Sequence, residues 1–419
     1  MKKAAGVLAL LLLSLPALPA DFFTLRGYFK NFFIAIFPPA TSEAGTVERA
    51  PAYGAVDDKL RLKLGFRFTS ALSLDCAYEI SPRVQDPRLF EESIYFSGQN
   101  PPEYRLADLR ERLYPGPAQT SASFGLFQNL DRFVITVKTS AADILVGRQP
   151  VAWGSGRVFN PTDVLAPFAF DELDKEERRG VDAIRVRVPV GPLDEIDFGA
   201  AAGRNFARSE SAFYLRGKTN QLRTDISGLV MSFRNHLLLG LDIARSIGGA
   251  GFWFEAADVV PVFFQSGGAE RAPGYFRASL GFDYNFSGRT YGFIEYHFNG
   301  AGESRPQAYL GLLSSPAFRD GFVYMFARHY VSIGSTYQIT PLIPFTGLVI
   351  LNLNDGSLVF APHLEYNIAE NIYLAAGGYL GFGKRPESAP GSGGQPPNLL
   401  SSEFGAYPGV VFASFRVYF

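Results

Sequence analysis

Apolar and polar residues alternate along much of this chain, most regularly between Asp58 and Ile80. Even-numbered positions over 60–68 and 72–80 carry Leu, Phe, Cys, Tyr or Ile, whereas most odd-numbered positions are charged or small. A period of two is typical of β-strands with one apolar and one polar face. The polar stretch 69–71 between the two halves therefore predicts a hairpin.

The numbering of the apolar positions also predicts the register of this hairpin. Because they stay even across the turn, the loop must contain an odd number of residues. A three-residue loop centred on Ser70 pairs Phe68 with Leu72 and Arg61 with Glu79. Apolar then faces apolar and basic faces acidic, as cross-strand pairing favours.

Two further hairpins follow the same pattern. Over 184–198, a turn centred on Gly191 pairs Val186 with Ile196, and the matching charged pairs are Arg187 with Glu195 and Arg185 with Asp197. The third hairpin covers 275–298 and turns at 287–289. Strand-like stretches also lie near 22–37, 129–139, 143–153, 223–246, 251–264, 326–353, 357–366 and 371–383. The alternation is least regular over 205–265, where individual strands are hardest to count.

The connections between these strands differ in length. Short turns alternate with long polar loops near 38–57, 82–123, 154–180, 299–325 and 384–403. Transmembrane barrels have short periplasmic turns and longer external loops. We therefore predict an all-β fold, a transmembrane antiparallel β-barrel of about 16–18 strands.

The two ends of the chain point to the same location. Lys2 and Lys3 precede an apolar run, and 17–20 offers small residues for cleavage, so 1–20 is predicted to be a signal peptide and 21–419 the barrel. Alternate residues of the last segment are apolar and end with Phe419. This segment resembles the C-terminal signal of bacterial outer-membrane barrels. The resemblance implies recognition by the barrel-assembly machinery and a place among the lipids of a Gram-negative outer membrane.

Composition narrows the possibilities further. Aromatic residues make up 15% of the chain, yet beyond the first twenty residues no long uncharged apolar run suggests a spanning helix. The net charge of −1 gives no sign of a nucleic-acid partner. Cys76 is the only cysteine, which excludes a disulfide framework and a cysteine metal site. No motif for a cofactor or a metal ion is found.

A barrel of this size is wide enough for an aqueous channel, which needs a constriction to select solutes. Segment 154–180 either folds inward as that constriction or stays outside as a solvated loop. Its charged residues include Arg157, Asp163, Arg178 and Arg179. The predicted inner faces add Lys59, Arg61, Lys63, Arg67, Arg185 and Arg187. Most of these have acidic partners across the strands, and an unpaired excess at Lys59, Lys63 and Arg67 would attract anions.

The segment 146–163 begins with Val-Gly-Arg-Gln and continues through Trp-Gly-Ser-Gly-Arg to Asn-Pro-Thr-Asp. It resembles the corresponding strand of outer-membrane channels of the alginate-export type and similar porin-like barrels. The resemblance implies a monomeric channel with large external loops. This chain lacks the dense arginine lining that a uronate-polymer pore would need, so the substrate is not carried over. We predict a channel for passive diffusion of small hydrophilic solutes or for export of a polymer. Arg148 within this motif either touches the solute or braces the end of its strand.

Two other functions stay open at this stage. A barrel enzyme of the lipase or protease type would need a catalytic histidine, and His297 shares a predicted inner face with Glu295. Two polar residues two positions apart on one strand share a face by default, so catalysis is not favoured. A structural or adhesive barrel would carry its function in the external loops. Whether the protein is a monomer or a trimer also stays open.

Overall fold

The computed structural model describes residues 22–43, 46–89, 104–119, 121–167, 170–264, 272–320, 323–387 and 400–419. The predicted signal peptide and its cleavage site lie outside these residues. Within them, no helix is long and apolar enough to cross a membrane.

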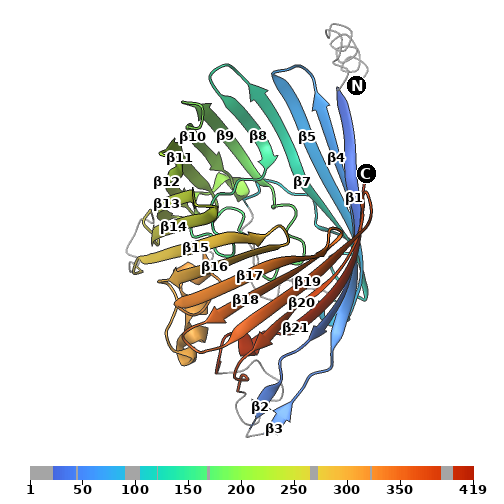
Figure 1. The fold of residues 1–419 in the computed structure, drawn as a ribbon. Helices are drawn as coiled ribbons and strands as arrows, with labels where there is room; N and C mark the ends of the chain where they lie inside the picture. Colours follow the sequence, from blue (N-terminus) through green and yellow to red (C-terminus); the bar gives the residue numbers. More distant parts are fainter. Residues whose placement is uncertain are drawn as a thin grey trace.

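Antiparallel strands close into a single barrel of 18 strands (Figure 1). The wall consists of β1 (Phe23–Phe37), β4 (Tyr53–Arg67), β5 (Leu72–Gln85), β7 (Phe124–Lys138), β8 (Asp143–Gln149), β9 (Val181–Pro189), β10 (Glu195–Ala201), β11 (Ala212–Gln221), β12 (Thr224–Phe233), β13 (His236–Ile247), β14 (Ala250–Val260), β15 (Tyr275–Ser287), β16 (Thr290–Asn299), β17 (His329–Thr340), β18 (Ile343–Asn352), β19 (Leu358–Ala369), β20 (Ile372–Phe382) and β21 (Gly409–Tyr418). β1 pairs with β21, so the sheet closes on itself. This confirms the predicted fold class and strand number.

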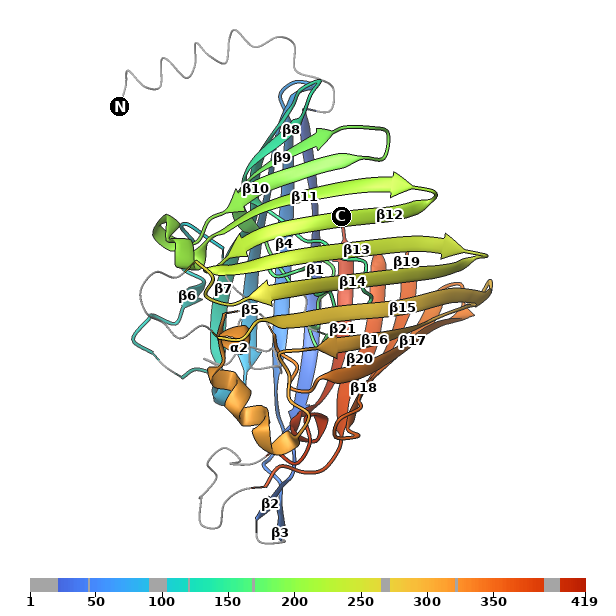
Figure 2. The ribbon, with the colours of Figure 1, turned by 90° about the vertical axis from the view of Figure 1, so that its left-hand side faces the viewer.

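Short elements lie between the wall strands. β6 (Arg112–Tyr114) pairs with β7, and β2 (Thr41–Glu43) pairs with β3 (Thr46–Glu48) in a separate hairpin that extends beyond the wall (Figure 2). The helical turns are η1 (Pro87–Leu89), η2 (Arg204–Phe206), η3 (Arg208–Glu210), η4 (Pro306–Ser314), α2 (Pro316–Arg319) and η5 (Phe404–Ala406).

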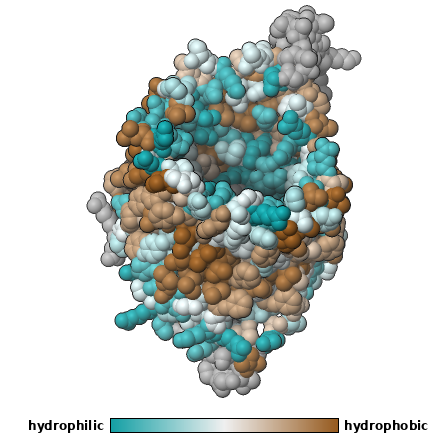
Figure 3. Space-filling model, in the orientation of Figure 1, coloured by the Kyte–Doolittle hydropathy of each residue, from teal (hydrophilic) through white to brown (hydrophobic). Residues whose placement is uncertain are grey.

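The alternation of side chains separates a wet interior from an apolar exterior. On β1, Lys30, Phe32 and Ile34 face inward and are buried, whereas Phe33 and Phe37 face outward and are 55% and 49% exposed. Figure 3 shows a hollow lined by hydrophilic residues, with hydrophobic residues gathered on the outer surface below it. This is the arrangement expected of a barrel that faces lipid outside and water inside.

The two ends of the barrel differ as the loop lengths predict. Short turns such as 68–71, 139–142 and 288–289 lie at the end where β1 begins and β21 finishes. Long connections at the opposite end include 38–52, 86–123, 150–180, 300–328 and 383–408. We call these the short-turn end and the long-loop end. The connections 234–235 and 353–357 are also short although they lie at the long-loop end.

The first hairpin register is confirmed, and the second is wrong by two residues. The backbone N–H of Phe68 donates to the carbonyl of Leu72 at 3.0 Å, and Arg61 lies opposite Glu79. In the second hairpin, Val186 lies opposite Phe198 rather than Ile196. The loop contains three residues, 191–193, and is closed by a bond from Val190 N–H to Asp194 O at 3.0 Å, so its centre is Pro192 and not Gly191.

Candidate functional site

The connection 150–180 between β8 and β9 folds into the barrel, and we call it the lumen segment. At its start, Val151 is fully buried and Trp153 is 9% exposed. The Trp153 ring packs edge-on against Tyr214 at 4.7 Å, and its indole N–H points to Asp197 at 3.4 Å. The chain thus turns inward immediately after β8, against the inner faces of β10 and β11.

Glu255 on the inner face of β14 holds the next part of the lumen segment. Its carboxylate accepts bonds from the backbone N–H groups of Ser155 (3.1 Å), Gly156 (3.2 Å) and Thr162 (2.8 Å). The Thr162 hydroxyl adds a fourth bond at 2.7 Å. Glu255 is fully buried, and all four partners can donate, so they replace the water that a carboxylate would otherwise bind.

Glu295 on β16 repeats this arrangement a few residues further on. It accepts bonds from the backbone N–H groups of Arg157 (2.7 Å), Val158 (3.2 Å) and Phe159 (2.9 Å). The indole N–H of Trp253 donates to it at 2.9 Å. Two buried carboxylates on neighbouring parts of the wall therefore fix the path of the backbone over 155–162.

The later part of the lumen segment is acidic and lies against basic residues of β1 and β4. The ammonium group of Lys30 lies 2.9 Å from Asp174 and 2.5 Å from Glu176. Glu177 lies close to Lys63, and 3.7 Å from Arg61. In the order of strands around the barrel, β1 and β4 lie about half the circumference from β14 and β16. The segment therefore spans the lumen.

The end of the lumen segment is attached to β7 through Asp131. This carboxylate accepts the backbone N–H of Gly180 at 2.9 Å and lies 2.5 Å from the guanidinium groups of Arg61 and Arg132. Asp131 is 2% exposed and Arg61 is 3% exposed. A buried carboxylate between two arginines fixes the return of the chain to β9.

Burial and ion pairs set the protonation of acids within the lumen segment. Burial raises the pKa of Asp163 to about 6, against the opposing effect of Arg178, which bonds to it. Burial also raises the pKa of Glu172 to about 7. Burial acts on Asp174 in the same direction, but Lys59 and Lys30 outweigh it and hold the pKa of Asp174 below its usual range.

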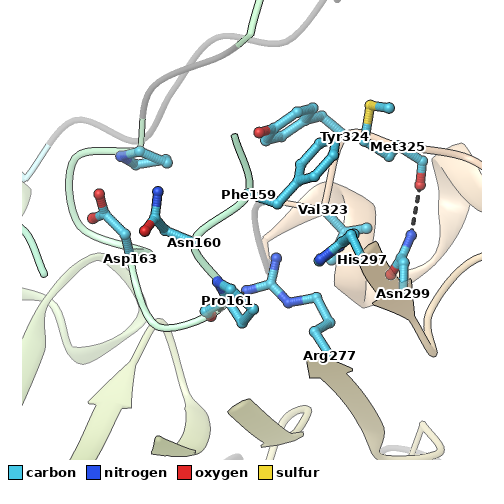
Figure 4. Close-up of a pocket in the computed structure, with 11 residues that line it drawn as sticks. Phe159, Asn160, Pro161, Asp163, Arg277, His297, Asn299, Val323, Tyr324 and Met325 are labelled. Carbon is cyan, nitrogen blue, oxygen red and sulfur yellow. Dashed lines mark hydrogen bonds between the residues drawn. The ribbon is translucent and has the colours of Figure 1, made fainter. Parts of the chain in front are cut away.

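A small cavity of about 30 Å³ lies between the lumen segment and the wall (Figure 4). Its lining includes Asn160, Asp163, Arg277, His297 and Asn299. The Arg277 side chain reaches toward Asn160 and Pro161 and donates to the carbonyl of Pro161 at 2.7 Å. A cavity of this size holds only one or two waters, so it is too small for an organic solute.

The basic residues predicted on the inner wall make the following contacts. Arg185 lies 2.6 Å from Asp197, and Arg187 lies 2.6 Å from Glu195, which are the predicted partners, reached diagonally because of the shifted register. Lys59 lies 3.8 Å from Asp174, and Lys63 is paired with Glu177. The lumen segment thus supplies acids to two of the three residues of the predicted basic excess, which removes much of the reason to expect anion attraction there.

The remaining candidates divide between exposed and buried positions. Arg67 is exposed at the short-turn end of β4, and Arg179 lies near enough to Glu172 to act on its charge. Arg157 is half exposed, with its side chain at 49%, and its guanidinium lies 2.6 Å from Asp283 and over the Trp253 ring at 5.1 Å. The Arg157 guanidinium is therefore a half-exposed cation beside the inner face of β15.

Arg148 is placed as a brace. Its guanidinium bonds to Asp182 at 2.7 Å and to Asp108 at 2.8 Å, and also to the carbonyls of Leu130 and Ala107, both at 2.7 Å. It is 5% exposed. These contacts favour the structural alternative for Arg148, a brace at the end of β8, over contact with a solute.

The inner face that holds His297 lacks the contacts of a catalytic pair. Glu295 bonds to the lumen segment, as described above, and His297 instead lies 2.9 Å from the hydroxyl of Ser279. That hydroxyl also reaches the carbonyl of Phe159 at 2.9 Å, which needs its proton. Within the described ranges, no three metal-ligating side chains form a group that could hold an ion.

Three side chains that organise the site were not among the sequence candidates: Lys30, Asp131 and Glu255. Lys30 and Glu255 each lie in an otherwise apolar strand, at one of the alternate positions that face inward. A charged residue at such a position was the signal that could have found them. Asp131 lies where the β5–β7 register shifts, and a pattern of period two loses its phase there.

Comparison with solved structures places this fold among outer-membrane barrels. OccAB2 of Acinetobacter baumannii superposes with a TM-score of 0.57 at 10% identity, over 95% of this chain and 98% of that one. OccD3 (OpdP) of Pseudomonas aeruginosa gives a TM-score of 0.53 at 11% identity, over 95% and 91%. OpdK of the same organism, solved with vanillate, gives 0.52 at 10% identity, over 96% and 100%.

Other comparisons found no relatives. No family model matches this chain, and no curated protein matches it. At such low identity the superpositions show the fold alone, that of an Occ-type porin barrel. They support the porin-like part of the sequence resemblance and give no support to the alginate-export group.

Proposed function

We propose that this protein is an outer-membrane channel for passive diffusion of small hydrophilic solutes, selected at a constriction formed by the lumen segment. The observation that carries the proposal is the crossing of the lumen by 150–180, held by Glu255 and Glu295 on one side and by Lys30 and Arg61 on the other. A structural barrel has no need of an ordered segment across a wet interior.

The barrels that it resembles support this function. They are Occ-type outer-membrane porins, and one of them was solved with vanillate, a small organic solute. Solute selection needs no covalent step, since pore width and the placement of charge at the narrow point decide which molecules pass. We also propose, from the terminal strand, that Phe419 is part of the signal for the barrel-assembly machinery.

The test is conductance of the refolded protein in a planar bilayer. We expect discrete, stable openings, and a variant with Asp174, Glu176 and Glu177 changed to Asn, Gln and Gln should conduct more, because the acidic part then loses its ion pairs with the wall. A salt gradient across the bilayer reads ion selectivity. A silent bilayer with a correctly folded barrel, confirmed by heat-dependent mobility on a gel, would refute the channel.

A further inference from the structure

A polar pair lies on the lipid-facing surface of the wall. On β1 the residues that face outward include Phe29, Asn31, Phe33 and Phe37, and Asn31 lies directly opposite Asp58 of β4. Asp58 also faces outward, since its neighbours Asp57 and Lys59 contact inward-facing Arg83 and the lumen segment. The Asn31 amide donates to Asp58 at 2.6 Å.

The depth of this pair makes it unusual. Along β1, Asn31 is midway between Leu25 and Phe37, whose side chains are exposed on the outer surface at 53% and 49%. Its outward neighbour on β21 is Phe415. An acidic side chain that faces lipid near the middle of the bilayer is unfavourable, and such residues usually face a partner or a water-filled cavity.

The two side chains leave hydrogen-bonding capacity unused between them. An amide carries two N–H donors, and the bond to Asp58 uses one of them. A carboxylate can accept about four bonds. The pair therefore keeps both a donor and an acceptor unused, side by side on the outer faces of neighbouring strands, and the buried Asn31 Oδ1 also has no partner among the described residues.

This arrangement is self-complementary under a two-fold axis along the membrane normal. Such an axis exchanges left and right on a facing surface, so Asn31 of one copy meets Asp58 of the second, and the reverse. Both pairs then close a ring of four side chains. A contact of this isologous kind is how most two-subunit assemblies form.

We propose that two copies of this barrel associate through the outer faces of β1, β4 and β21, with Asn31 and Asp58 at the centre of the interface. Toward the long-loop end the next outward pair is Phe33 opposite Val56, and small residues flank it, with Ala413 beside Phe33 on β21 and Ala35 opposite Gly54 one step further along. These small residues leave space beside Phe33, so that the two walls can approach one another there.

Disulfide trapping in vesicles tests the geometry. Cys76 is first changed to Ser, because it lies on the outer face of β5. Two single variants, Asn31→Cys and Asp58→Cys, are then folded into the same vesicles and oxidised. The mixture should give a covalent dimer in several-fold higher yield than either variant alone. A matched control mixes Val230→Cys with Leu239→Cys, an outward pair opposite one another on β12 and β13.

Asp58→Leu provides a second, independent test of the interface. If the pair joins two copies, this variant should fold, as its heat-dependent gel mobility will show, but lose the dimer seen for the unmodified barrel by native mass spectrometry. Asp258→Leu, which removes an exposed outward carboxylate of β14, should leave the dimer intact. A monomeric unmodified barrel, or equal cross-linking in the mixed and control samples, would overturn the proposal. It would mean that Asp58 is satisfied within one chain.

Discussion

Replacing Glu255 by Gln should release the first half of the lumen segment without unfolding the barrel. The carboxylate accepts two backbone N–H groups on one oxygen, from Ser155 at 3.1 Å and Gly156 at 3.2 Å, and two groups of Thr162 on the other. A glutamine can still accept from Thr162 through its carbonyl, but its NH₂ group then faces two other donors. Two bonds to a charged group are lost.

The structure sets the size of this effect. Hydrogen bonds to charged groups contribute about 1.5–3 kcal/mol each, so two lost bonds weaken docking of the segment by about 3 kcal/mol or more. Since about 1.4 kcal/mol corresponds to a factor of ten, the undocked population should rise by roughly a hundredfold. The barrel wall keeps all its strand pairing, so only the segment should respond.

Amide hydrogen exchange measures the effect directly. Exchange over 155–162 should accelerate by roughly a hundredfold in Glu255→Gln, and single-channel recordings should show more frequent excursions to higher conductance. Glu195→Gln is the matched control, because Glu195 also lies on the inner wall but its ion pair is with the partly exposed Arg187. Its effect should stay below about 1 kcal/mol. Unchanged exchange over 155–162 in a folded Glu255→Gln barrel would refute the role given to Glu255.

Three further predictions concern charges at the constriction. Arg157→Gln removes a half-exposed cation from the lumen and should shift the reversal potential in a salt gradient toward cation preference; an unchanged potential would remove Arg157 from the selective part of the pore. Lys30→Met leaves Asp174 and Glu176 without their buried partner and should increase mean conductance. Lys218→Met is the control, because it breaks a more exposed ion pair and should leave conductance unchanged. Equal effects of the two variants would contradict the assigned ion pairs. The pKa of Glu172 is raised to about 7 from 4.5, so docking should be strongest below pH 4.5, weaken as the pH rises to about 7 and change little above it. Recordings from pH 5 to 8.5 should show current noise that grows up to about pH 7 and then levels off, and a decrease of noise over pH 5 to 7 would contradict burial as the dominant effect on this carboxyl.

The sequence predicts the register of a hairpin well where the alternation of apolar and polar residues agrees with the position of the turn residues. The hairpin at Ser70 had both signals, and its register is correct. In the second hairpin, Gly191 and Pro192 marked a turn but not its centre, and the alternation of side chains fixes a register only to within steps of two. Arginine side chains are long enough to reach acids diagonally across strands, so the pairs Arg185–Asp197 and Arg187–Glu195 form in either register.

The stretch 205–265 was hard to divide because its turns lack the usual residues. Two-residue turns occur at 222–223 and at 234–235, and all four residues have positive φ, between 44° and 69°. Such turns normally use Gly, Asn or Asp, which tolerate this conformation, but only Asn235 is of that kind here. Because typical turn residues are missing, the sequence predicts one strand-like stretch over 223–246 where the structure has β12 and β13.

The constriction could be predicted in part. The mixed charges of 154–180 indicated a candidate, but not whether it folds inward. That outcome depends on Glu255, Glu295 and Lys30, which are distant in sequence and meet the segment only after the barrel has closed. No local pattern records such a contact. The loss of basic excess on β4 has the same origin, since the neutralising acids come from the segment itself.

The pairing of β1 with β21 has a consequence for the order of assembly. Gly27 and Phe419 exchange backbone bonds at 2.8 and 3.0 Å, and a side chain at Gly27 would meet the Phe419 ring. These partners are separated by almost the whole chain, and contacts between residues so distant in sequence are slow to form. One edge of β1 must wait unpaired until β21 arrives, and an open edge readily pairs with the wrong strand. The seam between the first and last strands is therefore the point at which folding in the cell most needs protection.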